Sequence, residues 1–214
     1  MNPKIPRKIA SLLEKRGFSS LRPCQEKSID AGLFDEKNLL VCTPTASGKT
    51  LVGELAALNG ILHDHGKAVY IVPLRALATE KYRQFKKDYP NLKIAVSTGD
   101  LDEKQSYLGN NDVIIVTSEK FDSLLRHKVD WLPAVKTVII DEIHLLNDPH
   151  RGPTLEVVLT IIRTTMNVQL IGLSATIGNK EELAAWLNAE LVEDDWRPVK
   201  LEKGVYLDGE IEFS

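Results

Sequence analysis

The 214-residue chain lacks several features that mark specialised classes of protein. It has two cysteines, Cys24 and Cys42, and their separation matches neither a metal-binding nor a redox motif. No apolar run approaches the roughly 20 residues that span a bilayer, and the start, Met1-Asn-Pro-Lys4, has no signal-peptide core. We therefore expect a cytoplasmic protein without a membrane segment, in which Cys42 packs as a small core residue.

An excess of charge of one sign is also missing. The 27 Lys and Arg residues against 30 Asp and Glu residues give a net charge of −3, which excludes a uniformly basic surface. Bases cluster locally at Lys81, Arg83, Lys86 and Lys87, where they could contact nucleic acid or form a solvated helix face. Weak net charge does not exclude nucleic acid, because main-chain amides and hydroxyls can follow a phosphate backbone.

Apolar strands and amphipathic helices alternate along the chain, without an internal repeat or a long linker. The expected strands cover 38–43, 68–73, 93–98, 112–117, 135–141 and 168–175. The expected helices cover 5–16, 23–32, 48–64, 75–88, 118–127, 153–166 and 179–188. This alternation predicts one α/β domain with a mostly parallel sheet and helices on both faces.

The expected strand at 38–43 runs into a segment with the features of a phosphate-binding loop. The amides of Thr45, Ala46, Ser47, Gly48, Lys49 and Thr50 can form an anion nest at a helix N-terminus. Gly48 allows close approach, Lys49 can reach the β- and γ-phosphates, and the Thr50 hydroxyl can ligate Mg²⁺. The generic pattern has glycine where this chain has Thr43. The alternative is an ordinary strand–turn–helix, but the strand before and the helical spacing after favour the loop.

A second apolar strand, 135–141, ends in the acids Asp141 and Glu142. Ligands of open α/β sheets bind at the carboxyl ends of strands. We therefore predict that Asp141 holds Mg²⁺ through its water shell and that Glu142 orients and polarises the attacking water. Without the phosphate loop, a pair of exposed loop acids would be the preferred interpretation.

These two segments, Thr43–Thr50 and Asp141-Glu-Ile-His144, resemble Walker A and Walker B of superfamily-two DExH-box helicases, and a third segment, Ser174-Ala-Thr176, resembles their motif III. Further segments resemble the Ski-like branch: Pro73-Leu-Arg-Ala-Leu-Ala78, Thr98-Gly-Asp100, Thr117-Ser-Glu-Lys120, Asp122-Ser-Leu-Leu-Arg126 and Arg151-Gly-Pro-Thr-Leu-Glu156. Within that branch the sequence is most similar to archaeal repair helicases that act on branched DNA. The resemblance covers nearly the whole chain, and Thr43 suits this branch. It implies a RecA-like P-loop NTPase domain that uses ATP and Mg²⁺, with Lys49, Asp141 and Glu142 catalytic.

The stretch 17–25 offers a nucleobase site. The Gln25 amide donates and accepts, which matches N6 and N7 of adenine, whereas guanine presents an acceptor in place of that donor. Phe18 or Arg22 could pack on the base, and the segment resembles the helicase Q motif. A glutamine near a helix start is ordinarily a surface residue, but beside the phosphate loop we predict that it reads adenine.

Several further residues follow strands that should end at the same sheet edge. The resemblance implies that this rim grips a sugar–phosphate backbone through Pro73, Arg75, Gly99, Thr117, Ser118, Lys120 and Arg151. Turn formation and helix capping explain many of these residues equally well. Ser174 and Thr176, with His144, are predicted to relay phosphate occupancy to the rim by switching hydrogen bonds. The alternative for His144 is a satisfied loop imidazole.

Residues 1–200 are expected to form a first RecA-like domain, and 201–214 to begin the crossing to a second one. The chain has no Gln-x-x-Gly-Arg-x-Gly-Arg segment, which in this family supplies arginine fingers worth roughly 10³–10⁵ in rate. We therefore expect the chain, a monomer, to bind Mg·ATP weakly, to hydrolyse it slowly at best, and to need the second domain for unwinding.

The expected function is the ATP-binding motor domain of a 3′–5′ DNA helicase acting on branched or forked DNA. An RNA helicase of the same branch stays open, because no reader of the 2′-hydroxyl can be identified. A nucleotide-gated module that binds or translocates protein is a further alternative. Intact Lys49, Thr50, Asp141 and Glu142 argue against a non-catalytic nucleotide sensor.

Overall fold

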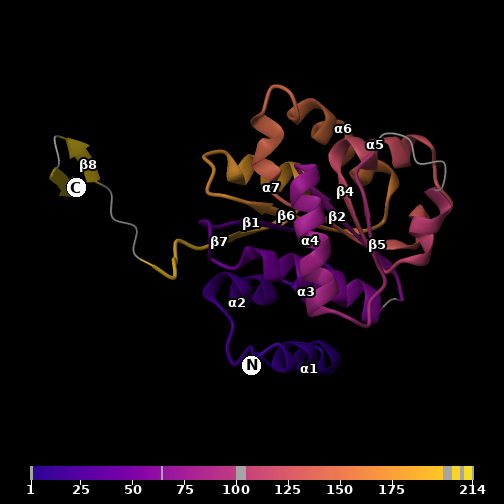
Figure 1. The fold of residues 1–214 in the computed structure, drawn as a ribbon, viewed down its shortest axis with the longest axis horizontal. Helices are drawn as coiled ribbons and strands as arrows, with labels where there is room; N and C mark the ends of the chain where they lie inside the picture. The colour runs from indigo at the N-terminus through magenta and orange to yellow at the C-terminus, as the bar shows by residue number, and fades with distance from the viewer. Residues whose placement is uncertain (1, 64, 100–104, 200–203, 208–209, 214) are drawn as a thin grey trace.

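The computed structural model describes residues 2–63, 65–99, 105–199, 204–207 and 210–213. Within these residues, seven parallel strands form one sheet (Figure 1). Their order is β3-β4-β2-β5-β6-β1-β7. The strands are β1 (Leu39–Cys42), β2 (Lys67–Val72), β3 (Ile94–Ser97), β4 (Val113–Thr117), β5 (Val135–Ile140), β6 (Gln169–Ser174) and β7 (Glu190–Glu193). The predicted parallel sheet is thus confirmed.

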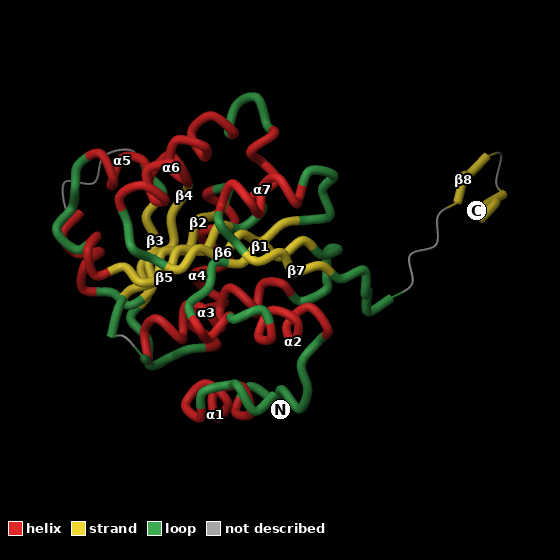
Figure 2. The backbone as a smooth tube through the Cα atoms, turned by 180° about the vertical axis from the view of Figure 1, so that it is seen from behind, coloured by secondary structure: helices red, strands yellow, loops and turns green. Residues whose placement is uncertain are grey.

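Helices cover both faces of the sheet, as Figure 2 shows from behind. Helices α1 (Arg7–Lys15), α2 (Pro23–Asp30), α3 (Lys49–Leu62) and α4 (Arg75–Asp88) contribute to one core cluster, and α5 (Ser118–Arg126), α6 (Gly152–Thr165) and α7 (Lys180–Leu187) to the other. Short 3₁₀ helices, which were not predicted, lie at Leu33–Asp35, Gln105–Asn110, Leu132–Ala134 and Ile143–Asn147.

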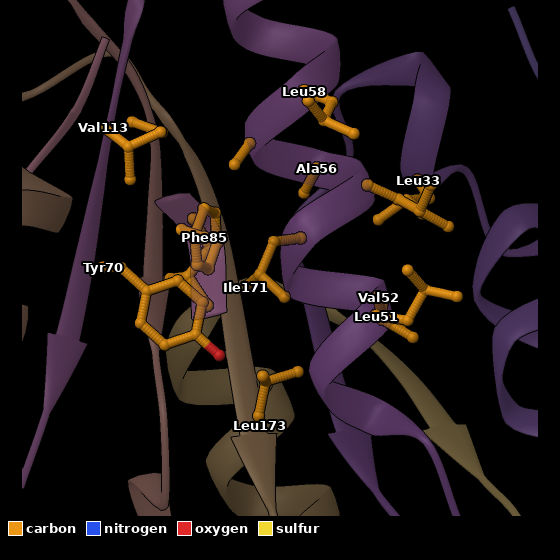
Figure 3. Close-up of a cluster of buried hydrophobic side chains, with 14 of the residues drawn as sticks. Leu33, Leu51, Val52, Ala56, Leu58, Tyr70, Phe85, Val113, Ile171 and Leu173 are labelled. Atoms are coloured by element: carbon orange, nitrogen blue, oxygen red, sulfur yellow. The ribbon is translucent and has the colours of Figure 1, made fainter. Parts of the chain in front are cut away.

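Strands β1 to β6 are mostly continuous apolar runs because nearly all of their residues are buried, on both faces of the sheet. In β1, Leu39 and Val41 face the α3 side, whereas Leu40 and Cys42 face the α6 side. Figure 3 shows the α3 side, where Tyr70 of β2 and Ile171 of β6 pack among helix side chains. Each large apolar side chain buried in this way contributes roughly 1.5–3 kcal/mol, so the sheet edge that carries the loops is held rigidly.

Strand β7 was not predicted from the sequence. It pairs with β1 at the sheet edge, and only Val192 of its four residues is buried. Two flanking glutamates mask the strand pattern, because an edge strand needs little apolar surface. Strands β8 (Gly204–Leu207) and β9 (Glu210–Phe213) form a separate antiparallel pair within the segment predicted as a crossing (Figure 1). Among the described helices, none combines the length and the apolar character needed to cross a membrane.

Candidate functional site

The loop after β1 and the acids after β5 emerge at the same edge of the sheet. Cys42 pairs with Ser174 at the end of β6, and Ile140 pairs with Gly172 of the same strand. Strand β6 therefore lies between the two segments, which places their starting points about 10 Å apart, two strand spacings. The structure thus brings together two elements that are distant in the sequence.

The loop adopts a conformation that requires a left-handed backbone at two positions. Ala46 has φ 65° and Gly48 has φ 99°, a region that most side chains disfavour. Thr43 Oγ1 lies 2.7 Å from Ser47 Oγ, and both side chains are buried. The threonine that replaces glycine in the generic pattern therefore ties the two limbs of the loop together. Lys49, the first residue of α3, is only 7% exposed.

The N-terminus of α2 binds three successive carbonyl oxygens of this loop. Arg22 Nη1 donates to Ala46 O at 2.6 Å, Cys24 Sγ to Ser47 O at 3.3 Å, and Gln25 Nε2 to Gly48 O at 3.0 Å. Carbonyls held toward α2 turn the amides of the same peptides to the opposite side, as an anion nest requires, and Ser47 N in addition donates to Pro44 O at 3.3 Å. Helix α2 therefore shapes the phosphate loop.

The candidate nucleobase residues already have partners within the domain. The Gln25 Oε1 accepts from Arg22 N at 2.8 Å while its Nε2 holds the loop. Phe18 is partly buried against the core, with the Arg16 guanidinium 5.2 Å from its ring centroid. The adenine-reading role of Phe18, Arg22 and Gln25 stays a prediction.

The Asp141 carboxylate is held at both oxygens. Oδ2 accepts from the Tyr70 hydroxyl at 3.3 Å and lies 3.8 Å from Lys81 Nζ, whereas Oδ1 accepts from Glu142 N at 3.1 Å. Burial and the nearby Asp141 charge raise the pKa of Tyr70, which stays a hydroxyl donor. Glu142 has φ 54°, and its Oε2 lies 3.3 Å from His144 Nδ1. The two acids are therefore oriented by β2, α4 and the turn itself.

Lys81 is a site residue whose orientation sequence reasoning missed. The sequence suggested either nucleic-acid contact or a solvated face, yet the Lys81 side chain is only 12% exposed and points at Asp141. The helical periodicity could have predicted this orientation. Lys81 lies three residues after buried Ala78 and four before buried Phe85, and therefore on the same face of α4. An ammonium among apolar helix positions needs a partner inside the fold.

The chemistry of these donors fits a magnesium–nucleotide complex. Among the described residues, no group of three or more His, Cys, Asp or Glu side chains could hold a metal alone. Mg²⁺ is ordinarily bound through one or two protein oxygens together with phosphates and waters. One oriented carboxylate, Asp141, with the Thr50 hydroxyl beside an anion nest meets that requirement.

The family model for DEAD/DEAH box helicases matches residues 22–184. The chain belongs to this helicase family. It is 53% identical over 206 residues to the "ATP-dependent DNA helicase Hel308" of Pyrococcus abyssi, covering 96% of this chain and 28% of the relative. The Methanocaldococcus jannaschii helicase of the same name is 53% identical over 214 residues, with 96% and 18% covered. The chain thus spans less than a third of these relatives, and the resemblance found in the sequence is confirmed.

Solved helicase structures agree with the fold. The DUF1998 helicase MrfA bound to DNA superimposes with a TM-score of 0.75 at 26% identity, covering 91% of this chain and 30% of that one. A second MrfA structure gives a TM-score of 0.74 at 25% identity, with 91% and 33% covered. The RecA-like helicase architecture predicted from the sequence is therefore confirmed.

Part of the rim predicted for this helicase domain gathers beside the acids. Pro73, Ser118 and Arg151 line one small cavity together with Asp141 and Glu142. This grouping brings residues from three loops next to the predicted metal ligand, as coupling between two ligands would require. Whether they contact nucleic acid stays a prediction.

The other rim residues lie at element ends. Thr117 caps α5, with Lys120 N donating to its Oγ1 at 3.4 Å. The Lys120 side chain is buried, and its Nζ has no hydrogen-bond partner within the described part of the chain. Arg75 opens α4 and is exposed, and Gly99 follows β3. Helix capping therefore accounts for Thr117, whereas the buried ammonium of Lys120 has no hydrogen-bond partner among the described residues.

The predicted coupling residues sit beside the phosphate loop. Thr43 N donates to Ser174 O at 3.3 Å, so β6 is joined directly to the loop. The Ser174 hydroxyl is buried without a hydrogen-bond partner among the described residues, and Thr176 is exposed two residues later. A buried hydroxyl without a partner is available to form a hydrogen bond when the site is occupied, which agrees with the predicted relay.

Proposed function

We propose that this chain is the N-terminal ATP-binding motor domain of an ATP-dependent 3′–5′ DNA helicase that acts on branched or forked DNA. One observation carries the proposal: the phosphate loop and the Asp141–Glu142 pair flank β6 at one edge of the sheet. Relatives about half identical to this chain are named ATP-dependent DNA helicases.

The roles follow from the positions. The loop amides and Lys49 bind the β- and γ-phosphates, and Thr50 with Asp141 holds Mg²⁺, which neutralises phosphate charge when bound. Glu142 orients the attacking water and accepts its proton. His144, whose Nδ1 lies 3.3 Å from Glu142 Oε2, acts with Ser174 and Thr176 in the relay to the rim. Pro73, Arg75, Gly99, Thr117, Ser118, Lys120 and Arg151 form the rim that holds one DNA strand.

We further propose that residues 1–200 are the first motor domain and that 201–214 lead to a second RecA-like domain. The short span of this chain within its relatives supports this division. The second domain would supply arginine fingers, worth roughly 10³–10⁵ in rate. The 214-residue chain should accordingly bind ATP with little turnover.

The test uses the full-length protein and two variants. Lys49→Ala should abolish ATP binding, measured by equilibrium titration with Mg·ATP. Glu142→Gln should leave ATP binding intact and remove DNA-stimulated hydrolysis and unwinding. Wild-type turnover in Glu142→Gln would overturn the water-orienting role. Matched single strands of DNA and RNA, compared by nucleotide-dependent affinity, decide between a DNA and an RNA substrate, and absence of salt-dependent binding to either would overturn the helicase proposal.

A further inference from the structure

The segment that follows β7 places an aromatic side chain beside the phosphate loop. Trp196 is 38% exposed, and the Arg22 guanidinium carbon lies 5.5 Å from its ring centroid. The same guanidinium donates to Ala46 O at the exposed crest of the loop. Arg22 therefore bridges the loop and the indole ring.

Trp196 is held in this place by a salt bridge to α2. Lys27 Nζ lies 2.8 Å from Asp194 Oδ2 and donates to Glu193 O at 2.8 Å. Asp194 Oδ1 in turn accepts from Trp196 N at 2.6 Å. A segment after β7 that only led away from the domain would need none of these contacts. The exposed indole is thus fixed by the helix that also supports the phosphate loop.

We propose that Trp196 and Arg22 together form the stacking platform for the nucleobase of a bound nucleoside triphosphate. The inference rests on the proposed function, because it needs the triphosphate in the loop. A triphosphate held by the loop amides leaves its nucleoside beyond the loop, where a planar surface is required. Indole and guanidinium planes both stack on a purine, and the guanidinium–indole contact orients the two planes together.

A stacking platform also explains why Trp196, an aromatic residue with an exposed face, lies beside Arg22 and the phosphate loop. Gly48 packs against the Arg22 stem, since a Cβ there would lie 2.9 Å from Arg22 Cδ. The loop, Arg22 and Trp196 are therefore layered in contact. Stacking of a base on an aromatic side chain commonly raises affinity by roughly 5- to 150-fold.

The experiment compares ATP with inorganic tripolyphosphate, which carries the phosphates without a base, for binding to the 214-residue chain in Mg²⁺. Trp196→Ala should lose affinity for ATP by roughly 5- to 150-fold and leave tripolyphosphate affinity unchanged. Trp196→Phe, which retains an aromatic ring, should keep most of the ATP affinity. In a chain with Trp131→Phe and Trp186→Phe, ATP but not tripolyphosphate should quench the remaining Trp196 fluorescence.

The chain offers a matched control. Trp186 also packs on an arginine, with Arg163 at 4.7 Å, but on the helices of the opposite sheet face. Trp186→Ala should leave both affinities unchanged. The platform is overturned if Trp196→Ala binds ATP as wild type does, or if it loses ATP and tripolyphosphate equally, which would mean that Trp196 only supports the loop. Failure of the wild-type chain to bind ATP would overturn the proposed function as well.

Discussion

Lys81 Nζ lies 3.8 Å from Asp141 Oδ2 and 5.0 Å from the centroid of the Tyr70 ring. The lysine comes from α4, the helix that begins at the rim residue Arg75. The ammonium group of Lys81 on α4 thus lies beside the Asp141 carboxylate, which is predicted to hold Mg²⁺. Movement of α4 would change the charge around Asp141, and would thereby give the predicted rim an electrostatic route to the predicted phosphate site.

Lys81→Met should lower the Mg²⁺ concentration needed for ATP binding, by roughly three- to tenfold. The reason is repulsion, because the ammonium and the metal share one carboxylate. The measurement is ATP binding titrated with Mg²⁺. Lys86→Met, an exposed lysine on the same helix, is the control and should leave the midpoint unchanged. An unchanged or higher midpoint in Lys81→Met would contradict this.

Gly48→Ala should disrupt the phosphate loop. The new Cβ would lie 2.6 Å from Gln25 Nε2, and φ is +99°. Strain of about 1–3 kcal/mol should appear as a loss of ATP affinity of roughly 5- to 150-fold. At Gly99, in contrast, a Cβ meets no atom of the described residues within 4 Å. Gly99→Ala is therefore the control for nucleotide binding, and equal effects of the two substitutions would argue against the packing of α2 on the loop.

Arg16→Met should destabilise the domain strongly. Arg16 joins α1 to Glu54 of α3 at 2.8 Å and to Asp88 of α4 at 2.7 Å, and the Tyr89 hydroxyl also donates to Glu54 at 2.7 Å. The Glu54 side chain is only 2% exposed, so removing its cation should cost about 3–5 kcal/mol of unfolding free energy.

Denaturant unfolding measures this loss, with two comparisons. Adding Glu54→Gln to Arg16→Met should recover part of the stability, because the unpaired charge is gone. Arg126→Met removes an exposed pair with Asp122 and should cost less than about 1 kcal/mol. A loss below that value in Arg16→Met would show that the buried network contributes little.

Asp194→Asn should cost stability in a pH-dependent manner. Burial raises the pKa of Asp194, but the hydrogen bonds from Lys27 and from Trp196 N outweigh it and leave the pKa below its ordinary value. Stability from this carboxylate is therefore fully present above the unfolded-state pKa of about 3.9 and is lost as the pH falls through the lower folded-state pKa.

The expected loss in Asp194→Asn is about 2 kcal/mol at pH 7, and the wild type and the variant should converge in strong acid. Urea unfolding at a series of pH values measures both. The exposed neighbour substitution Asp195→Asn should stay within about 0.5 kcal/mol of wild type. A difference that persists undiminished below the folded-state pKa would show that packing, and not charge, holds this segment.

Much of the fold could be predicted because its signals are local. Continuous apolar runs marked β1 and β5, and the buried stripe Leu155, Val158, Leu159 and Ile162 marked α6. Strand β7 could not be predicted, because Glu190–Glu193 becomes a strand only by pairing with β1, which lies far away in the sequence. The strand propensity of these four residues carries no information about the distant strand with which they pair.

The same division applies to the site. The sequence by itself determined the loop around Gly48 and Lys49 that is predicted to bind phosphate, and the acidic strand end at Asp141, because each is specified by neighbouring residues. Only the tertiary structure decided that β6 lies between them, that Lys81 turns toward Asp141, and that Trp196 meets Arg22. Those contacts join residues far apart along the chain, and their geometry is fixed by strand order and by burial on both sheet faces rather than by any local pattern.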